Sequence, residues 1–282
     1  MNRLKFVEER VARLLMWLSV AIVLFFVASV ILSVMRRGVP VLTWDMVSSL
    51  PGGGFYIGKE GGFLNAIVGS AYIVGASTVL GLIVSIPVVF YMNVYLKPDS
   101  RLAYISRLAF DVLFGIPSIV YGAFGFTIMI FLGLRASLLG GIIVVTLLII
   151  PILIRSMDEV AKTIPEEILD SSYSLGATRI ETIGVVVRQI APAIATATLL
   201  SIGRAIGDAA GVMFTAGFSD SIPDSLTRPA ATLPLSVFFQ LSAPQAEVQD
   251  RAYAAAVVLT VIVLILSLTG RFILNRFSKN KG

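Results

Sequence analysis

Long apolar runs alternate with short polar stretches along most of the chain. Six of these runs reach the roughly 20 consecutive apolar residues that a helix needs to cross the hydrocarbon core of a bilayer. They cover residues 12–35, 63–92, 112–133, 137–157, 189–216 and 252–274. The pattern therefore predicts an all-α, polytopic membrane protein with about six transmembrane helices.

The basic residues divide unequally between the two sides of these spans. The loops on one side, together with both chain ends, hold fifteen of the 22 Lys and Arg residues. The loops on the other side hold six: Arg36, Arg37, Lys59, Arg135, Arg228 and Arg251. The remaining one, Arg204, lies inside the fifth span. Because short cytoplasmic loops carry the excess of Lys and Arg, we expect a multi-pass cell (inner) membrane protein with both termini in the cytoplasm.

Composition narrows the classes of function. Hydrophobic residues make up 57% of the chain and charged residues 14%, compared with about 25% charged in soluble domains. The chain contains no His and no Cys, which removes the commonest general base, the commonest metal ligand and all thiol chemistry. An enzyme is therefore not expected, and neither is a cofactor on this chain. The basic residues behind the net charge of +5 lie almost entirely in the loops and chain ends that flank the spans. We therefore expect contact with membrane lipid and none with nucleic acid.

One polar stretch, EEILDSSYSLGATRIETI at residues 166–183, separates the fourth and fifth apolar runs. Two pairs have the spacing of a helix-capping box: Thr163 with Glu166, and Thr178 with Glu181. Gly176, which precedes the second pair, suits the turn at the end of a helix. The pattern predicts a short helix, a glycine turn and a second helix that continues into the fifth span. Local chemistry leaves two alternatives open, a docking site for another protein and a solvated loop.

The fifth predicted span contains two ionisable residues, Arg204 and Asp208, four positions apart. Charged residues are costly inside a bilayer, so they mark a functional site or a structural ion pair. On a continuous helix the same face carries Ser201 and Thr215. A neighbouring row suits close helix packing: Gly203, Gly207 and Gly211. We predict a substrate path in which Arg204 attracts anions and Asp208 orients its guanidinium, and a purely structural ion pair is the alternative.

Two outer segments are also informative. Residues 230–241 are apolar but too few to cross a bilayer, which predicts a re-entrant hairpin or a covered interfacial helix, with a surface loop as the alternative. Residues 53–60, GGFYIGKE, have the spacing of a phosphate-binding loop. Glu60 stands where that loop needs Ser or Thr, so a glycine-rich outer loop is predicted instead.

Several stretches resemble the permease subunits of ABC importers. DSSYSLGA at residues 170–177 is similar to their E-A-A-x-x-x-G loop, although three of its four motif positions are substituted. GIPSIVYG, GRAIGD, FTAG and TLP, which lie between residues 115 and 234, resemble the PstA-type permeases of phosphate importers. This likeness runs from about the second span to the last, and it implies the MetI-like fold of ABC importer permeases.

The resemblance also implies a division of the chain. Residues 1–62 would hold the first span and an outer loop, residues 63–274 the permease core with a coupling loop at 158–188, and residues 275–282 a tail. The implied contacts with the ATPase are six: Glu166, Glu167, Asp170, Ser171, Ser172 and Gly176. The implied partners are a homologous permease of PstC type, a dimeric ATPase of PstB type that holds ATP and Mg, and an extracytoplasmic phosphate-binding protein of PstS type.

The chain departs from the family pattern at two places, the first in the loop motif and the second in a stretch that bears on the substrate. Val186 and Arg188-Gln189 replace a later I-x-L-P motif, and Asp208 followed by Ala-Ala-Gly replaces Glu followed by Thr-Ala-Pro. Phosphate is the expected substrate, and sulfate, molybdate or an amino acid are the alternatives. A stand-alone channel or secondary carrier is a separate alternative that leaves the polar loop unexplained. A membrane enzyme ranks third because no catalytic cluster exists.

Overall fold

The computed structural model describes residues 3–52, 60–97 and 100–279, and this part of the chain is almost entirely helical. The predicted glycine-rich loop at 53–60 lies, except for Glu60, outside the described residues. Five helices are long and apolar enough to cross a membrane. They are α1 (Arg3–Gly38), α3 (Leu64–Phe90), α6 (Leu138–Ala161), α8 (Arg179–Ile206) and α10 (Ala246–Lys279). The sixth candidate span is a bent pair, α4 (Arg101–Gly115) and α5 (Ser118–Phe131).

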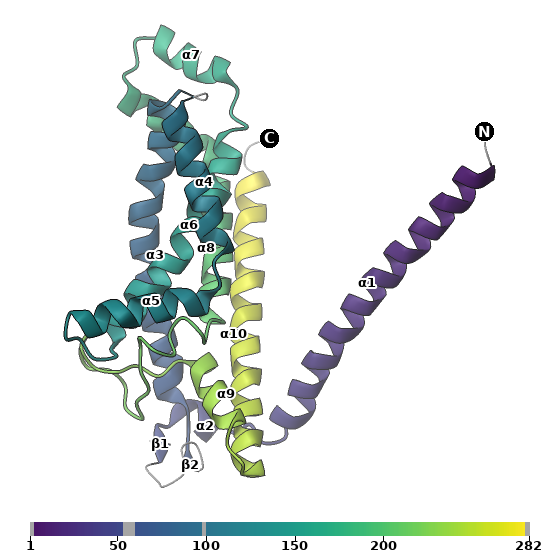
Figure 1. Cartoon of the computed structure of the whole chain (residues 1–282), viewed down its shortest axis with the longest axis vertical. Helices are drawn as coiled ribbons and strands as arrows, with labels where there is room; N and C mark the ends of the chain where they lie inside the picture. Colours follow the sequence, from purple (N-terminus) through teal and green to yellow (C-terminus); the bar gives the residue numbers. More distant parts are fainter. Residues whose placement is uncertain (1–2, 53–59, 98–99, 280–282) are drawn as a thin grey trace.

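Shorter elements lie at the two ends of the bundle (Figure 1). One end carries α7 (Glu166–Ser174) and the π-helix η1 (Tyr91–Tyr95), which extends α3. The other end carries α2 (Trp44–Ser48), α9 (Leu233–Leu241) and a two-stranded antiparallel sheet of β1 (Pro51–Gly52) and β2 (Glu60–Gly61). Helix α1 begins and α10 ends at the α7 end, so both termini lie on one side.

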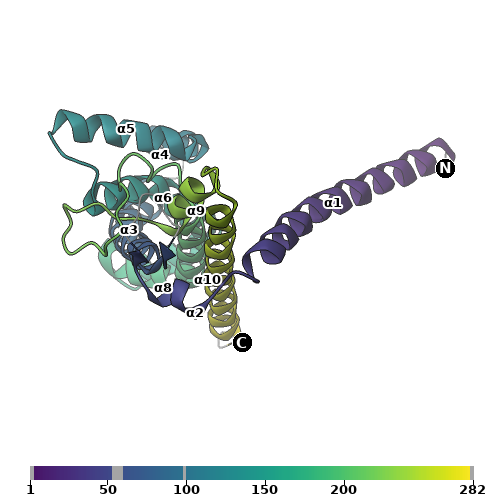
Figure 2. The same ribbon diagram turned by 90° about the horizontal axis from the view of Figure 1, so that it is seen from below.

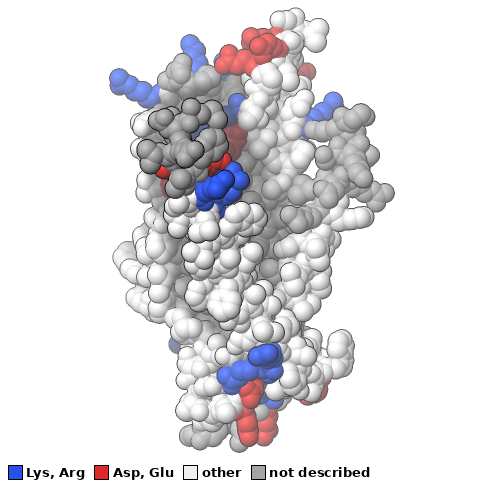
Figure 3. All heavy atoms as spheres, turned by 90° about the vertical axis from the view of Figure 1, so that its right-hand side faces the viewer, with Lys and Arg blue, Asp and Glu red and all other residues white. Residues whose placement is uncertain are grey.

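Helices α3, α6 and α8 form the core of the bundle, with α6 most deeply buried. Small residues on α3 allow α6 to approach closely, as the spacing of Ser77, Gly81 and Ser85 suggests. Ser77 donates a hydrogen bond of 2.9 Å to the backbone carbonyl of Ile142. A Cβ added at Gly81 would lie 2.9 Å from the side chain of Leu153. Between its charged ends the molecule presents a broad uncharged band, as a bilayer requires (Figure 3).

Helix α1 leaves the bundle at the α9 end and extends away from it in both ribbon views (Figures 1 and 2). Its base is fixed by Arg37, which forms a 2.7 Å ion pair with Asp250 and lies 4.3 Å above the ring of Tyr253. The apolar side chains from Val11 to Leu32 are all exposed in the isolated chain. This helix is long and apolar enough to cross the membrane, and along most of its length it is not covered by the rest of its own chain.

The predicted third span, residues 112–133, is not one straight helix. Helix α4 ends at Gly115 and α5 begins at Ser118, with an angle of 98° between the two. Pro117 lacks a backbone N–H and disfavours a helical residue before it, and Ile116 is accordingly extended, with φ −72° and ψ 129°. Helix α5 consequently lies across the side of the bundle (Figure 1).

The short apolar segment at residues 230–241 forms the covered helix that the sequence favoured over a surface loop. Leu233 and Leu235 of α9 are completely buried. The hydroxyl of Ser70 on α3 accepts a 2.9 Å hydrogen bond from the backbone N–H of Leu233. The chain just before α9 passes so close to Gly69 that a Cβ there would collide with the carbonyl oxygen of Ala231. The α9 segment therefore closes one end of the bundle.

Candidate functional site

Helix α7 and the turn after it form the first candidate site. Gly176 has φ +84°, a left-handed conformation that favours glycine, as predicted. The predicted capping box of Thr178 and Glu181 is present: Glu181 accepts from the backbone N–H of Thr178 at 2.8 Å, and Thr178 accepts in return at 3.4 Å. Helix α8 then runs unbroken into the membrane-spanning bundle. The predicted box of Thr163 and Glu166 is wrong, because Pro165 occupies the N-cap position and has no side chain that can accept.

The six residues implied as ATPase contacts divide between the faces of α7. Glu166 and Asp170 line a cavity between α7 and the rest of the bundle. Ser172 lies 3.2 Å from the hydroxyl of Thr182 and so connects α7 to α8. The others are exposed and face away from this cavity: Glu167, Ser171 and Gly176. The same outward side presents Leu175, which is 89% exposed.

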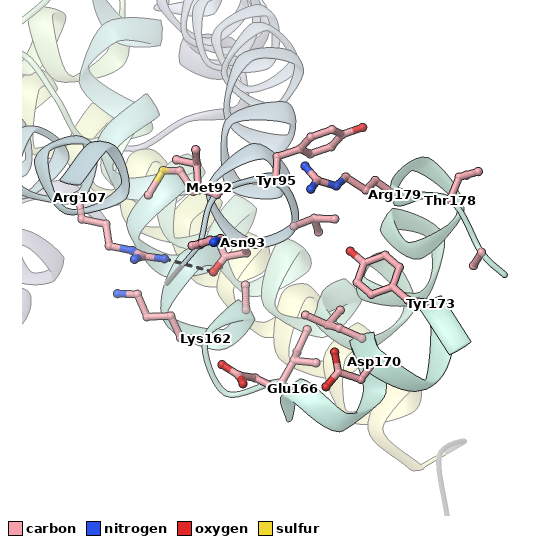
Figure 4. Close-up of a pocket in the computed structure, with 17 residues that line it drawn as sticks. Met92, Asn93, Tyr95, Arg107, Lys162, Glu166, Asp170, Tyr173, Thr178 and Arg179 are labelled. Carbon is pink, nitrogen blue, oxygen red and sulfur yellow. Dashed lines mark hydrogen bonds between the residues drawn. The ribbon is translucent and has the colours of Figure 1, made fainter. Parts of the chain in front are cut away.

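The cavity beneath α7, called here the α7 cavity, has a volume of about 980 Å³ (Figure 4). Four cationic side chains and two carboxylates line it: Lys97, Arg107, Lys162 and Arg179, with Glu166 and Asp170. The guanidinium of Arg179 stands 5.4 Å above the ring of Tyr95, and this contact joins the first turn of α8 to η1. The cavity is therefore bordered by elements that are far apart in sequence and is partly open to solvent.

A buried cluster around Asp158 supports one wall of the α7 cavity. The Asp158 side chain is 6% exposed. It accepts hydrogen bonds from Arg107 at 3.0 Å and from Asn93 at 2.8 Å, and it lies 2.9 Å from the ammonium of Lys162. One carboxylate thus faces two cations, and α4, η1 and the end of α6 are held together. This cluster was not predicted from the sequence, in which only Asp158 and Lys162, four positions apart, give a local signal.

Arg204 is the second candidate site, and its surroundings differ from those predicted. The predicted fifth span continued to residue 216, but α8 ends at Ile206 and the chain then turns. Arg204 and Asp208 are therefore not on one helical face, and no ion pair joins these two residues. Instead, Asp208 accepts a 2.8 Å hydrogen bond from the backbone N–H of Gly211. Arg204 lies in the last turn of α8, where a cation complements the helix dipole.

Arg204 is exposed on a face of α8 that is open in this chain. A Cβ added at Gly203 would meet nothing within 4 Å, so the predicted glycine row does not pack against the described residues there. Ser201 and Thr215 are fully buried. Thr215 donates to the carbonyl of Gly211 at 3.0 Å, and the Ser201 hydroxyl has no hydrogen-bond partner within the described chain. The structure thus brings Arg204, but not Ser201 or Thr215, to the open face.

These two sites suit transport and docking better than catalysis. Among the described residues, no group of acidic side chains could hold a metal ion. The exposed guanidinium of Arg204 can bind an anion through paired hydrogen bonds. Helix α7 offers polar and apolar side chains on a projecting element, which is the arrangement of a protein-binding surface.

Known proteins provide independent information. The sequence model described as "Binding-protein-dependent transport system inner membrane component" matches residues 77–280. The phosphate transport system permease protein PstA of Yersinia pestis is 30% identical over 275 residues, which cover 97% of this chain and 91% of that protein. The PstA protein of Haemophilus influenzae is 29% identical over 259 residues, covering 91% of this chain and 90% of that one.

Solved structures agree on the fold. A chain from the inward-facing MetNI methionine ABC transporter superimposes with a TM-score of 0.61 at 16% identity, covering 76% of this chain and 95% of the other. The expected MetI-like fold of ABC importer permeases is thereby confirmed, and so is a multi-pass protein of the inner membrane. The chain belongs to the family of binding-protein-dependent transport system inner membrane components.

Proposed function

We propose that this chain is one of two permease subunits of an ATP-driven phosphate importer. The names of the relatives support phosphate as the substrate, and the exposed Arg204 supports an anion. The observation that carries the proposal is the projecting helix α7, whose outer face is exposed and whose C-terminal turn is fixed by Gly176. A channel or secondary carrier would leave this element unexplained.

The partners follow from the same proposal. A PstC-type permease would cover the open face of α8 and complete the path beside Arg204. A dimeric PstB-type ATPase, which would hold the ATP and Mg, would bind the outer face of α7. A PstS-type binding protein would deliver phosphate at the α9 end. This places the α7 end and both termini in the cytoplasm, in agreement with the excess of Lys and Arg in those loops.

Arg204 is given the role of attracting phosphate into the path. Its guanidinium is planar and always charged, so it suits the tetrahedral oxygens of phosphate better than an ammonium group does. The Asp208 carboxylate accepts the backbone N–H of Gly211 and forms no ion pair with the Arg204 guanidinium. The departure at residues 208–211 from the family motif leaves sulfate, molybdate or an amino acid as the alternative substrates.

The test is uptake of radiolabelled phosphate into vesicles that contain the chain with its neighbouring gene products. We expect uptake only when ATP is present on the side of the membrane where the ATPase lies. Unlabelled phosphate should compete with the labelled phosphate for uptake, and sulfate should not. Arg204→Gln should lower uptake at least about tenfold, equivalent to about 1.4 kcal/mol of anion binding, and Arg204→Lys should restore only part of it. Arg10→Gln, which removes an exposed cation near the start of α1, is the matched control. Uptake without ATP, or normal uptake in Arg204→Gln, contradicts the respective claim.

A further inference from the structure

We propose that the α7 cavity binds a phosphate-bearing anion, either the head group of an anionic phospholipid or free phosphate, and that this anion competes with the carboxylates on the inner face of α7 for the cations of the cavity. This binding site is separate from the substrate path at Arg204, and it does not depend on the substrate that the path carries.

The charge of the cavity wall supports an anionic ligand. Arg107 and Lys162 share the single carboxylate of Asp158, so this cluster keeps a surplus positive charge. Figure 4 shows Arg107 and Lys162 on one side of the cavity and Arg179 on another. Lys97 also lines the cavity and is exposed. Phosphate oxygens are the acceptors that such convergent cations bind best.

The two carboxylates of the cavity explain how binding could act on α7. Glu166 and Asp170 lie one turn apart on the inner face of α7. Neither forms an ion pair with any described residue, although four cations line the same cavity. An anion on the cationic wall competes with these carboxylates for the cations. Binding of the anion therefore favours positions of α7 in which the carboxylates remain unpaired, as they are here.

The size and position of the cavity favour a lipid head group as the source of the phosphate. Its volume of about 980 Å³ is at the upper end of small-ligand sites, which span roughly 300–1,000 Å³. Met92, Leu96 and Leu169 give it an apolar part that a free ion would not need. The cavity lies at the ends of the candidate membrane spans that contain α3 and α6, and Tyr95 is an aromatic residue of the kind enriched where spans meet the membrane surface.

Binding in this cavity is compatible with docking of α7 to another protein. The residues that line the cavity, such as Asp170, occupy the inner face of α7. Ser171 and Leu175, which do not line it, are exposed on the remaining surface. The anion and a partner protein therefore do not compete for the same side chains.

The test is a calorimetric titration of the purified full chain in an uncharged detergent. The probes are a short-chain phosphatidylglycerol, inorganic phosphate and, as the zwitterionic comparison with zero net charge, a short-chain phosphatidylcholine. The double variant Lys97→Gln/Arg179→Gln removes two exposed cations of the cavity. The matched control Arg10→Gln/Arg101→Gln removes two exposed cations that do not line it.

We expect saturable binding of phosphatidylglycerol that is at least about tenfold weaker in the cavity variant and unchanged in the control. Binding of inorganic phosphate with the same dependence would support the proposal and identify the free ion as the source. The proposal is overturned if neither probe binds saturably, if the two double variants behave alike, or if phosphatidylcholine binds as tightly as phosphatidylglycerol.

A second variant protects the result against simple misfolding. Glu166→Gln/Asp170→Asn removes the competing carboxylates and keeps the shape of both side chains. Anion binding should therefore become several-fold tighter, which a damaged protein does not imitate. Unchanged or weaker binding in this variant contradicts the competition between the anion and α7.

Discussion

Single atoms decide where the helices of this protein touch. The clearest case is Gly69 on α3, where the absence of a side chain lets the carbonyl of Ala231 lie directly against the helix. Its neighbour Ser70 uses its hydroxyl to accept the backbone N–H of Leu233, which would otherwise be an unpaired donor at the start of α9. Two adjacent small residues therefore attach α9 to the bundle, one by its lack of volume and one by a hydrogen bond.

A pair of glycines on α3 tests this account. Gly69→Ala should place a methyl group against the Ala231 carbonyl and destabilise the α9 end by about 1–3 kcal/mol. Gly75→Ala adds the same group to the same helix where nothing lies within 4 Å, and it should be neutral or stabilising by about 0.5–1 kcal/mol. The measurement is the melting temperature of each purified variant in one detergent. Equal melting temperatures would show that the close approach at Gly69 contributes nothing.

At the scale of helices, what could be predicted depends on how local the cause is. The capping box at Thr178 and the turn at Gly176 are local, so the sequence predicts both. The end of α8 at Ile206 was missed because apolar content continues to residue 216, while the helix stops where Asp208 turns to the N–H of Gly211. The bend at Pro117 was visible in the sequence as a helix breaker, but apolarity alone suggested one span.

The turn after α7 gives a prediction at this scale. A Cβ at residue 176 would meet nothing within 4 Å, so any effect of substitution comes from the backbone conformation. Gly176→Val forces a branched side chain into the left-handed region, at a cost of about 1–2 kcal/mol, and should loosen α7. Gly176→Asn should be milder because Asn tolerates this region. Hydrogen exchange of peptides within residues 166–183 should be faster in Gly176→Val than in Gly176→Asn. Identical exchange in the two variants would contradict a role for the positive φ.

For the whole molecule, the sequence predicts the number of spans and the fold class but not the arrangement. Periodicity and length identify α1 as a span, yet they cannot indicate that it stands apart from the bundle, held by Arg37 and Asp250 at its base. The cluster around Asp158 was likewise missed, because Asn93 and Arg107 come from other elements and share no spacing with it. Long-range contacts of this kind are properties of the assembled bundle.

Orientation in the membrane is a property of the whole molecule as well, and the absence of cysteine makes it easy to measure. Ser174 at the end of α7 and Ser225 in the segment before α9 are both exposed and lie at opposite ends of the bundle. We expect a cysteine at residue 174 to react only with reagents that reach the cytoplasm, and one at residue 225 only with an impermeant reagent outside. The reason is the excess of Lys and Arg in the loops at the α7 end. Labelling of residue 174 from outside intact cells would contradict this orientation. Helix α7 would then lie beyond the reach of a cytoplasmic ATPase, and the proposed coupling would lose its basis.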